Sequence, residues 1–328
     1  MSALFSPVTV RDVRFRNRVV MPPMVCAGMP DMRNLVDPEG HVGEAILDHY
    51  TRRARAGTGM IIVEATAVDA GGRCWKGGLC AHSDEYVPGL GRLAKRIQAE
   101  GAVACIQLLH GGPASSSELT GRAPMGPNTL SVADMLTIEE RFADAARRCV
   151  AAGFDAVELH GAHGFLLDSF LSTDRNNRSD AYGGVIGGRM RLLVETCSLV
   201  KSRIGEDALL GCRISVFNHL TEGFASGDLE RLVQGIEGAG ADLLHLSVME
   251  GAALDGYFGS DRTLGQWARA STCVPIIMAG RLGNPRDAER AVAEGHADFA
   301  AVGSAMLEDA EWTQRAREVL EGEGEVTS

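Results

Sequence analysis

The chain contains very little lysine. Of its 32 basic residues only Lys76, Lys95 and Lys201 are lysine, and the others are arginine. Lys95 and Lys201 fall within amphipathic stretches and Lys76 lies in a glycine-rich segment, so no lysine ends a predicted strand. Schiff-base catalysis requires a lysine amine at the reacting carbon. The sequence therefore excludes the aldolase class that works through such a lysine.

Long apolar runs and paired cysteines are also missing. No apolar run reaches the roughly 18 residues that a membrane span needs, and the N-terminal segment shows no secretory signal. The eight cysteines include no Cys-x-x-Cys pair, and several lie inside apolar runs, which is typical of reduced, buried thiols. These features predict a cytoplasmic protein with no metal site and no membrane partner.

A basic surface and two nucleotide-binding motifs are absent as well. The formal net charge of -11 disfavours binding to nucleic acid. No Gly-x-Gly-x-x-Gly follows a predicted strand and no Gly-x-x-x-x-Gly-Lys occurs, which argues against an open dinucleotide-binding sheet and excludes P-loop chemistry. We therefore expect a small-molecule substrate as the partner, and a homo-oligomer is left open.

What the sequence does contain is a regular alternation of two patterns. Eight short apolar runs, rich in β-branched residues, predict parallel strands that are covered on both faces: Arg18–Met21, Gly59–Val63, Val103–Leu108, Ala156–Leu159, Leu209–Ile214, Leu243–Val248, Pro275–Met278 and Phe299–Val302. Amphipathic stretches follow each run, and six of them end at a glycine, as helices often do. We predict an α/β protein, a (β/α)₈ TIM barrel that forms a single domain over residues 1–328.

The ends of these runs carry the polar residues of interest. In such barrels the catalytic groups lie at the carboxyl ends of the strands. Gly280–Arg281 follows the seventh run and Gly303–Ser304 the eighth, where barrels commonly bind phosphate. Gln107 and Arg213 end two other runs. Together they suit a planar heterocycle with carbonyl and ring-nitrogen edges.

Two histidines, His160 and His163, stand three residues apart after the fourth run. A zinc site would need further ligands, and no aspartate or glutamate is placed to complete one. Two N–H donors could instead grip a carbonyl or carboxylate oxygen and polarise it. A structural role in a helix cap or in the core is the third interpretation.

Five motifs in order resemble the Old Yellow Enzyme family, which are FMN-dependent ene-reductases on a (β/α)₈ barrel. The motifs lie at Leu4–Met24, Glu64–Val68, Ile106–His110, Ala152–Gly164 and Arg175–Gly184. The resemblance runs from Leu4 to about Trp312, which is nearly the whole chain. It implies the same fold that the alternating pattern predicts.

The resemblance also implies the cofactor, the hydride donor and the site residues. FMN would be bound and NAD(P)H would reduce it, with Gln107 at the pyrimidine edge and Arg213 near N1 and O2. His160 and His163 would bind the activating oxygen of the substrate, and in relatives this pair also holds phenolates against the flavin. The residues expected to contact FMN are Pro23, Met24, Ala65, Gln107, Arg213, Gly280, Arg281, Gly303 and Ser304.

The substrate pocket departs from the family pattern. The tyrosine that usually donates a proton is Phe165, which has no proton to give. The redox-tuning cysteine of one subgroup is replaced by Val25, with Cys26 one residue later, and the last phosphate motif has Ser304 in place of arginine. Tyr257, in the loop after the sixth run, is the one tyrosine expected to reach the cavity.

We therefore expect an NAD(P)H-dependent flavin oxidoreductase that passes hydride to an electron-poor C=C bond such as that of an enone. Because Phe165 cannot act as an acid, a flavin-dependent isomerase or dehydrogenase is an alternative. A flavin-free barrel lyase or hydrolase that uses His160 and His163 is a second alternative. A flavin-binding protein without turnover is a third.

Overall fold

Eight parallel strands close into a barrel in the computed structural model, which describes residues 2–29, 32, 34–215, 224–248 and 252–322. Neighbouring strands follow the order β10-β3-β4-β5-β6-β7-β8-β9, so consecutive strands pair and the last pairs with the first. Their bounds are β3 Val19–Met21, β4 Met60–Ala67, β5 Val103–Leu109, β6 Ala156–Gly161, β7 Leu209–Ser215, β8 Leu243–Ser247, β9 Ile276–Ala279 and β10 Phe299–Ala301. The predicted (β/α)₈ barrel is confirmed.

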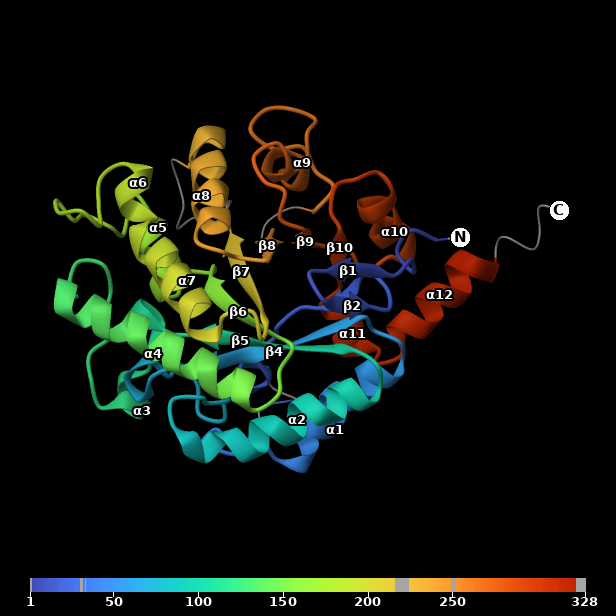
Figure 1. Ribbon diagram of the computed structural model, residues 1–328, viewed down its shortest axis with the longest axis horizontal. Helices are drawn as coiled ribbons and strands as arrows, with labels where there is room; N and C mark the ends of the chain where they lie inside the picture. The colour runs from blue at the N-terminus through green and yellow to red at the C-terminus, as the bar shows by residue number, and fades with distance from the viewer. Residues whose placement is uncertain (1, 30–31, 33, 216–223, 249–251, 323–328) are drawn as a thin grey trace.

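Helices form the outer ring of the barrel (Figure 1). The long ones are amphipathic and bury apolar residues on one face: α1 Glu44–Arg55, α2 Val87–Ala99, α4 Val132–Ala151, α7 Arg191–Ile204, α8 Ser226–Gly238, α10 Pro285–Ala293 and α12 Trp312–Gly322. The six-residue helix α9 Leu264–Arg269 also lies in this ring and contacts β9. Short helices lie in the loops: α3 Ser117–Thr120, α5 Leu166–Leu171, α6 Ile186–Arg189, α11 Ser304–Glu308, and the 3₁₀ turns Cys26–Gly28, Ala70–Gly72, Asp84–Tyr86 and Gly112–Ala114. The six glycines that follow helices have positive φ, from 59° at Gly205 to 102° at Gly57, as the sequence predicts.

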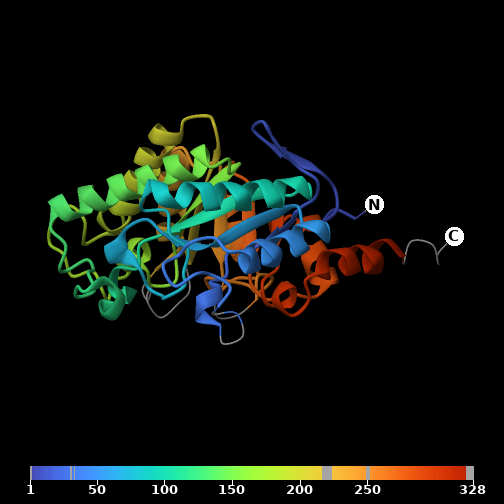
Figure 2. The same cartoon turned by 90° about the horizontal axis from the view of Figure 1, so that it is seen from below.

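A short hairpin that the sequence analysis does not predict precedes the barrel. Its strands, β1 Val8–Val10 and β2 Val13–Phe15, pair in antiparallel fashion. The Phe15 ring is fully buried and meets the Phe299 ring of β10 edge to face, with the centroids 5.0 Å apart. In Figure 2 the dark blue hairpin lies at one end of the barrel, and the loops that follow β3 to β5 lie at the other. The hairpin therefore closes the amino end of the barrel.

The barrel interior changes from apolar to polar along the strands. Alternate residues of the strands join Val10 and Phe15 in one apolar cluster, separate from the larger cluster beneath the helices. Its strand members are Val20, Met60, Ile62, Val103, Cys105, Ala156, Leu209, Leu243, Ile277, Ala279, Phe299 and Ala301. Because successive side chains of a strand alternate between its faces, the residue two positions after Cys105, Ala156 or Leu243 continues the same inward face. Those residues are polar, and they lead toward the carboxyl ends.

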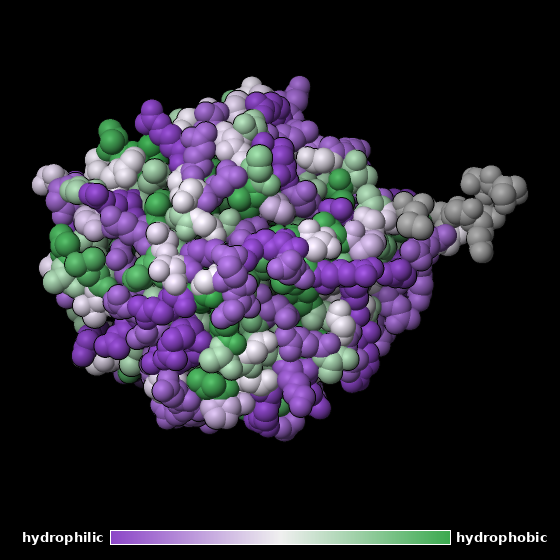
Figure 3. Space-filling model, in the orientation of Figure 1, coloured by the Kyte–Doolittle hydropathy of each residue, from purple (hydrophilic) through white to green (hydrophobic). Residues whose placement is uncertain are grey.

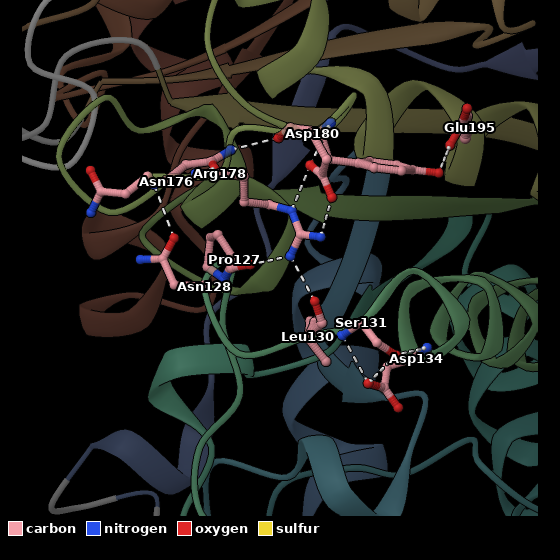
Figure 4. Close-up of polar contacts among 11 residues, drawn as sticks. Pro127, Asn128, Leu130, Ser131, Asp134, Asn176, Arg178, Asp180 and Glu195 are labelled. Atoms are coloured by element: carbon pink, nitrogen blue, oxygen red, sulfur yellow. Dashed lines mark hydrogen bonds and ion pairs between the residues drawn. The ribbon is translucent and has the colours of Figure 1, made fainter.

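The segment of the fifth family motif has a structural role. Figure 4 shows the Arg178 guanidinium held between main-chain oxygens of the α3–α4 loop and the Asp180 carboxylate. It donates to the carbonyl oxygens of Pro127 and Leu130, the latter at 2.6 Å. The Tyr182 hydroxyl donates to Glu195 on α7 at 2.8 Å. These bonds fasten the loop after α5 to the start of α4 and to α7.

The surface is mostly hydrophilic on the face shown in Figure 3, with apolar side chains interspersed as small patches. Among the described residues, no helix has the length and apolar character to cross a bilayer.

Candidate active site

The end of β6 brings His160 and His163 together. His160 is the fifth residue of the strand and is 4% exposed. His163 has φ 61°, a left-handed conformation that is uncommon outside glycine, and its main-chain N–H donates to the Ser215 hydroxyl of β7 at 3.1 Å. This turn places the two imidazole rings with centroids 4.9 Å apart and nearly perpendicular. The two histidines that the sequence pairs by their spacing therefore have adjacent side chains.

Both imidazoles are neutral near pH 7. Burial, with the Arg213 charge close by, lowers the pKa of His163 to about 2 and the pKa of His160 well below its usual range. A neutral imidazole carries one N–H donor and one acceptor nitrogen. The Nδ1 atom of His160 is buried and has no hydrogen-bond partner among the described residues. The part of the chain that is described holds no group of three or more histidine, cysteine or acidic side chains placed to bind a metal ion.

Arg213 connects this pair to the rest of the site. Its Nη2 donates to the Ser247 hydroxyl of β8 at 3.0 Å, and that oxygen lies 2.9 Å from Nε2 of His163. Its Nη1 donates to the carbonyl oxygen of Pro23 at 3.4 Å, whereas Nε is buried and has no partner within the described part of the chain. Burial lowers the pKa of Arg213 to about 10, so the guanidinium remains charged near pH 7. A fixed cation thus lies beside the two neutral histidines.

Gln107 belongs to a buried polar network that the sequence analysis misses. Its Nε2 donates to Oε1 of Glu158 at 2.8 Å, and Oε2 of Glu158 lies 2.7 Å from Nδ1 of His245. All three residues are at most 1% exposed. The available signal was the same one that singles out Gln107, because Glu158 and His245 are polar residues inside apolar strands.

The predicted phosphate-binding residues line one cavity of about 520 Å³. Gly280, Arg281, Gly303 and Ser304 meet there, and Pro22, Met24, Arg213, Ser247 and Glu308 complete much of the wall. A Cβ on Gly280 would lie 2.9 Å from the Val248 Cβ, and φ at this glycine is 156°, so a side chain is excluded. Arg281 and Ser304 are exposed at the rim. The loops after β9 and β10 therefore form a cradle that opens toward Arg213.

The segment after β3 is fixed by a buried carboxylate. The Cys26 N–H donates to Oε2 of Glu64 at 2.9 Å, and the Leu79 N–H donates to Oε1 at 3.4 Å. Burial raises the pKa of Glu64 to about 7 and raises the pKa of the Cys26 thiol. Cys26 is fully buried and Val25 is partly exposed, while Ala65 lies beside the register shift of β4. The geometry places Cys26 in the core rather than at an open surface.

An aromatic wall flanks the histidines. The Phe165 ring lies 4.8 Å from the His160 ring and 5.7 Å from the Trp75 ring, both edge to face. Trp75 is absent from the sequence-based site, although its position in the loop after β4 was a possible signal. The Tyr257 hydroxyl donates to the carbonyl oxygen of Ala252 in its own loop at 3.3 Å, and burial raises the pKa of Tyr257 to about 12.

The whole barrel matches known flavoproteins. Residues 3–323 match the model of the NADH:flavin oxidoreductase / NADH oxidase family. An NADH oxidase of Thermoanaerobacter brockii is 32% identical over 98% of this chain, which spans 51% of that relative's length. An NADPH dehydrogenase of Geobacillus sp. is 34% identical, with 97% of this chain and 94% of the relative covered.

Solved structures agree on the fold. An old yellow enzyme homologue from Zymomonas mobilis superposes with a TM-score of 0.84 at 23% identity, over 98% of this chain and 93% of that one. Morphinone reductase superposes with a TM-score of 0.82 at 24% identity, over 96% of this chain and 89% of that one. The family match and the relatives at 32–34% identity, together with this shared fold, confirm the resemblance to the Old Yellow Enzyme family. The chain belongs to the NADH:flavin oxidoreductase / NADH oxidase family, whose cofactor is FMN and whose hydride donor is NADH or NADPH.

Proposed function

We propose that the chain is a single-domain, FMN-dependent reductase that transfers hydride from NAD(P)H through the flavin to an activated alkene such as an enone. The observation that carries this proposal is the pair of neutral imidazoles, His160 and His163, beside the buried cation of Arg213. Such donors stabilise negative charge that develops on a carbonyl oxygen during reduction of the conjugated double bond.

The residues present fit FMN. The cradle at Gly280 and Gly303 offers main-chain N–H groups and the Arg281 charge for a phosphate. Arg213 lines the same cavity, and its buried Nε has no partner among the residues described. A buried polar atom of this kind costs free energy unless a ligand satisfies it. Bound FMN supplies hydride-transfer chemistry at this position.

His163 can adopt the tautomer that a substrate oxygen requires. Arg213 donates to the Ser247 hydroxyl oxygen, which leaves the Ser247 O–H able to donate to Nε2 of His163. His163 then carries its proton on Nδ1 and can donate it to the substrate oxygen. His160 supplies the second donor. The protein thus orients and polarises the substrate without a charged histidine.

Phe165 favours a second candidate function. The ring extends the apolar wall between His160 and Trp75, and it offers no proton to the substrate carbon. The Tyr257 hydroxyl is engaged with Ala252. A flavin-dependent isomerase or dehydrogenase needs no proton from this wall, whereas a reductase would take its proton from water.

The purified protein tests this proposal. We expect a yellow protein whose released flavin has the mass of FMN, and anaerobic NAD(P)H oxidation that converts 2-cyclohexenone to the saturated ketone. A colourless protein that refuses added FMN would contradict every flavin-dependent function and favour a lyase or hydrolase. Bound FMN with double-bond migration instead of reduction would favour the isomerase. Bound FMN without turnover on either reaction would leave a binding protein.

A further inference from the structure

The interior of the barrel holds a carboxylate that the proposed chemistry does not use. Glu158 lies on the inward face of β6, two residues before His160, and it is 1% exposed. Below it on the same face Ala156 belongs to the apolar cluster of the barrel floor. A buried carboxylate costs several kcal/mol unless it is hydrogen-bonded or paired. Its partners therefore indicate what it does.

Glu158 fixes the orientation of the Gln107 amide. An ionised carboxylate only accepts hydrogen bonds, so the Gln107 atom 2.8 Å away must be the NH₂ nitrogen. In the proposed flavin site, Oε1 is then the end of the Gln107 amide that is left to accept a hydrogen bond. A pyrimidine N–H of bound FMN would be the donor. A flipped amide would place an NH₂ group against that N–H.

His245 holds the other oxygen of the same carboxylate. Burial lowers the pKa of His245, so the ring is neutral and its Nδ1–H donates to Glu158 at 2.7 Å. The opposite nitrogen, Nε2, is buried without a partner among the described residues. His245 therefore serves Glu158 and no other described group through its ring nitrogens. The network runs in one direction, from His245 and Gln107 to a single acceptor.

Glu158 also acts on Arg213 through charge. Arg213 pairs in register with His160 on one side and with His245 on the other, so it lies among the partners of Glu158. No ion pair within 4.0 Å joins Arg213 to Glu158 among the described residues, yet the carboxylate raises the pKa of the guanidinium against the effect of burial. The carboxylate thus offsets part of the positive potential that Arg213 presents to the cavity.

We propose that Glu158 is a positioning residue that, held by His245, fixes the Gln107 amide and offsets the Arg213 charge, and so sets the affinity and reduction potential of the flavin. This inference rests on the proposed flavin site. It gives the barrel interior a role in setting the properties of the cofactor, in addition to its role in packing. His245 contributes by keeping the Glu158 carboxylate in place.

The test compares Glu158→Gln with Glu139→Gln in the FMN-loaded protein. Glu139 is a matched control, because it is also a buried glutamate but lies on the outer helix α4. Glu158→Gln removes the negative charge and allows either orientation of Gln107. Reduction adds negative charge to the flavin, so we expect a more positive midpoint potential. We also expect about tenfold weaker binding of both FMN and riboflavin, since one hydrogen bond at the ring is lost.

The other variants keep the proposal open to refutation. Glu158→Asp retains the charge, and we expect its midpoint potential to lie closer to wild type than that of Glu158→Gln, even where stability falls. A potential unchanged in Glu158→Gln, or changed equally in Glu139→Gln, would overturn the proposal while leaving the flavin function intact. A wild-type protein that binds no FMN would instead refute the proposed function.

Discussion

The two ends of the barrel interior are built in opposite ways. At the amino end the hairpin and the strands pack apolar side chains into one cluster, with Phe15 against Phe299. At the carboxyl end the same inward faces carry Gln107, Glu158 and His160, and several buried nitrogens there have no partner among the residues that the structure describes. The polar groups of the carboxyl end would be completed by the proposed FMN, whereas the apolar amino end needs no ligand. We therefore expect substitutions at the amino end to change mainly the free energy of unfolding, and substitutions at the carboxyl end to change mainly the activity.

A substitution that opens a large cavity at the amino end tests the first half of this comparison. Phe15→Ala removes a fully buried ring, and we expect the free energy of unfolding to fall by about 3–5 kcal/mol. The turnover of each bound FMN should change less than twofold. Denaturant unfolding and steady-state kinetics on flavin-normalised samples measure the two effects. A parallel loss of turnover in the folded variant would show that the two ends are coupled.

Loss of one histidine tests the second half. His160→Ala or His163→Ala removes a donor to the substrate oxygen, and we expect enone reduction to fall by about 10²–10³. Flavin reduction by NAD(P)H should be retained, which stopped-flow measurement of each half-reaction resolves. Because the pKa of His163 is about 2, its ring is neutral throughout and enone reduction should show no histidine ionisation between about pH 5 and 8. Variants that lose FMN would assign these histidines a structural role.

Substitution in the phosphate cradle, also at the carboxyl end of the barrel, is expected to have a smaller effect. Arg281→Ala removes one cation from the rim of the cavity, and we expect FMN binding to weaken by about 1.5–3 kcal/mol. Riboflavin, which lacks the phosphate, should bind both proteins equally. Titration of the apoprotein with each flavin measures the difference. Equal FMN affinity in variant and wild type would place the phosphate elsewhere.

The aromatic wall gives the smallest expected change. Phe165→Tyr adds a hydroxyl beside His160, and we expect enone reduction to accelerate about tenfold, less than an optimised general acid provides. Tyr257→Phe should leave the rate nearly unchanged, because the Tyr257 hydroxyl is engaged with Ala252. Single-turnover reoxidation by 2-cyclohexenone compares the two variants. A large loss in Tyr257→Phe would identify this tyrosine as the acid.

Much of the fold was predictable because its signals are local. Apolar runs mark the eight strands, and glycines such as Gly57 mark helix ends through their positive φ. The hairpin of β1 and β2 was missed because each strand has three residues and the turn contains Arg11 at φ 50° rather than a glycine. Short strands with an unusual turn residue give little sequence signal.

The arrangement of the candidate site was predictable where position along a strand decides it. Gln107 and Arg213 stand out as polar residues near the ends of apolar strands, each two positions before the last residue, and the histidine pair follows from its spacing. The network around Glu158 was not predictable in this way, because its partners come from β5 and β8, 51 and 87 residues away in the chain. The role proposed for this network depends on hydrogen-bond directions and burial, and these are known only from the folded barrel.

Phenol binding tests the central claim most directly, namely that His160 and His163 together grip an oxygen against the flavin. The FMN-loaded protein is titrated with a phenol, and the long-wavelength band of the stacked phenolate is recorded. We expect a saturable band in the wild-type protein that disappears in both His160→Ala and His163→Ala, with FMN retained in each. A band of undiminished intensity and affinity in both variants would contradict the account.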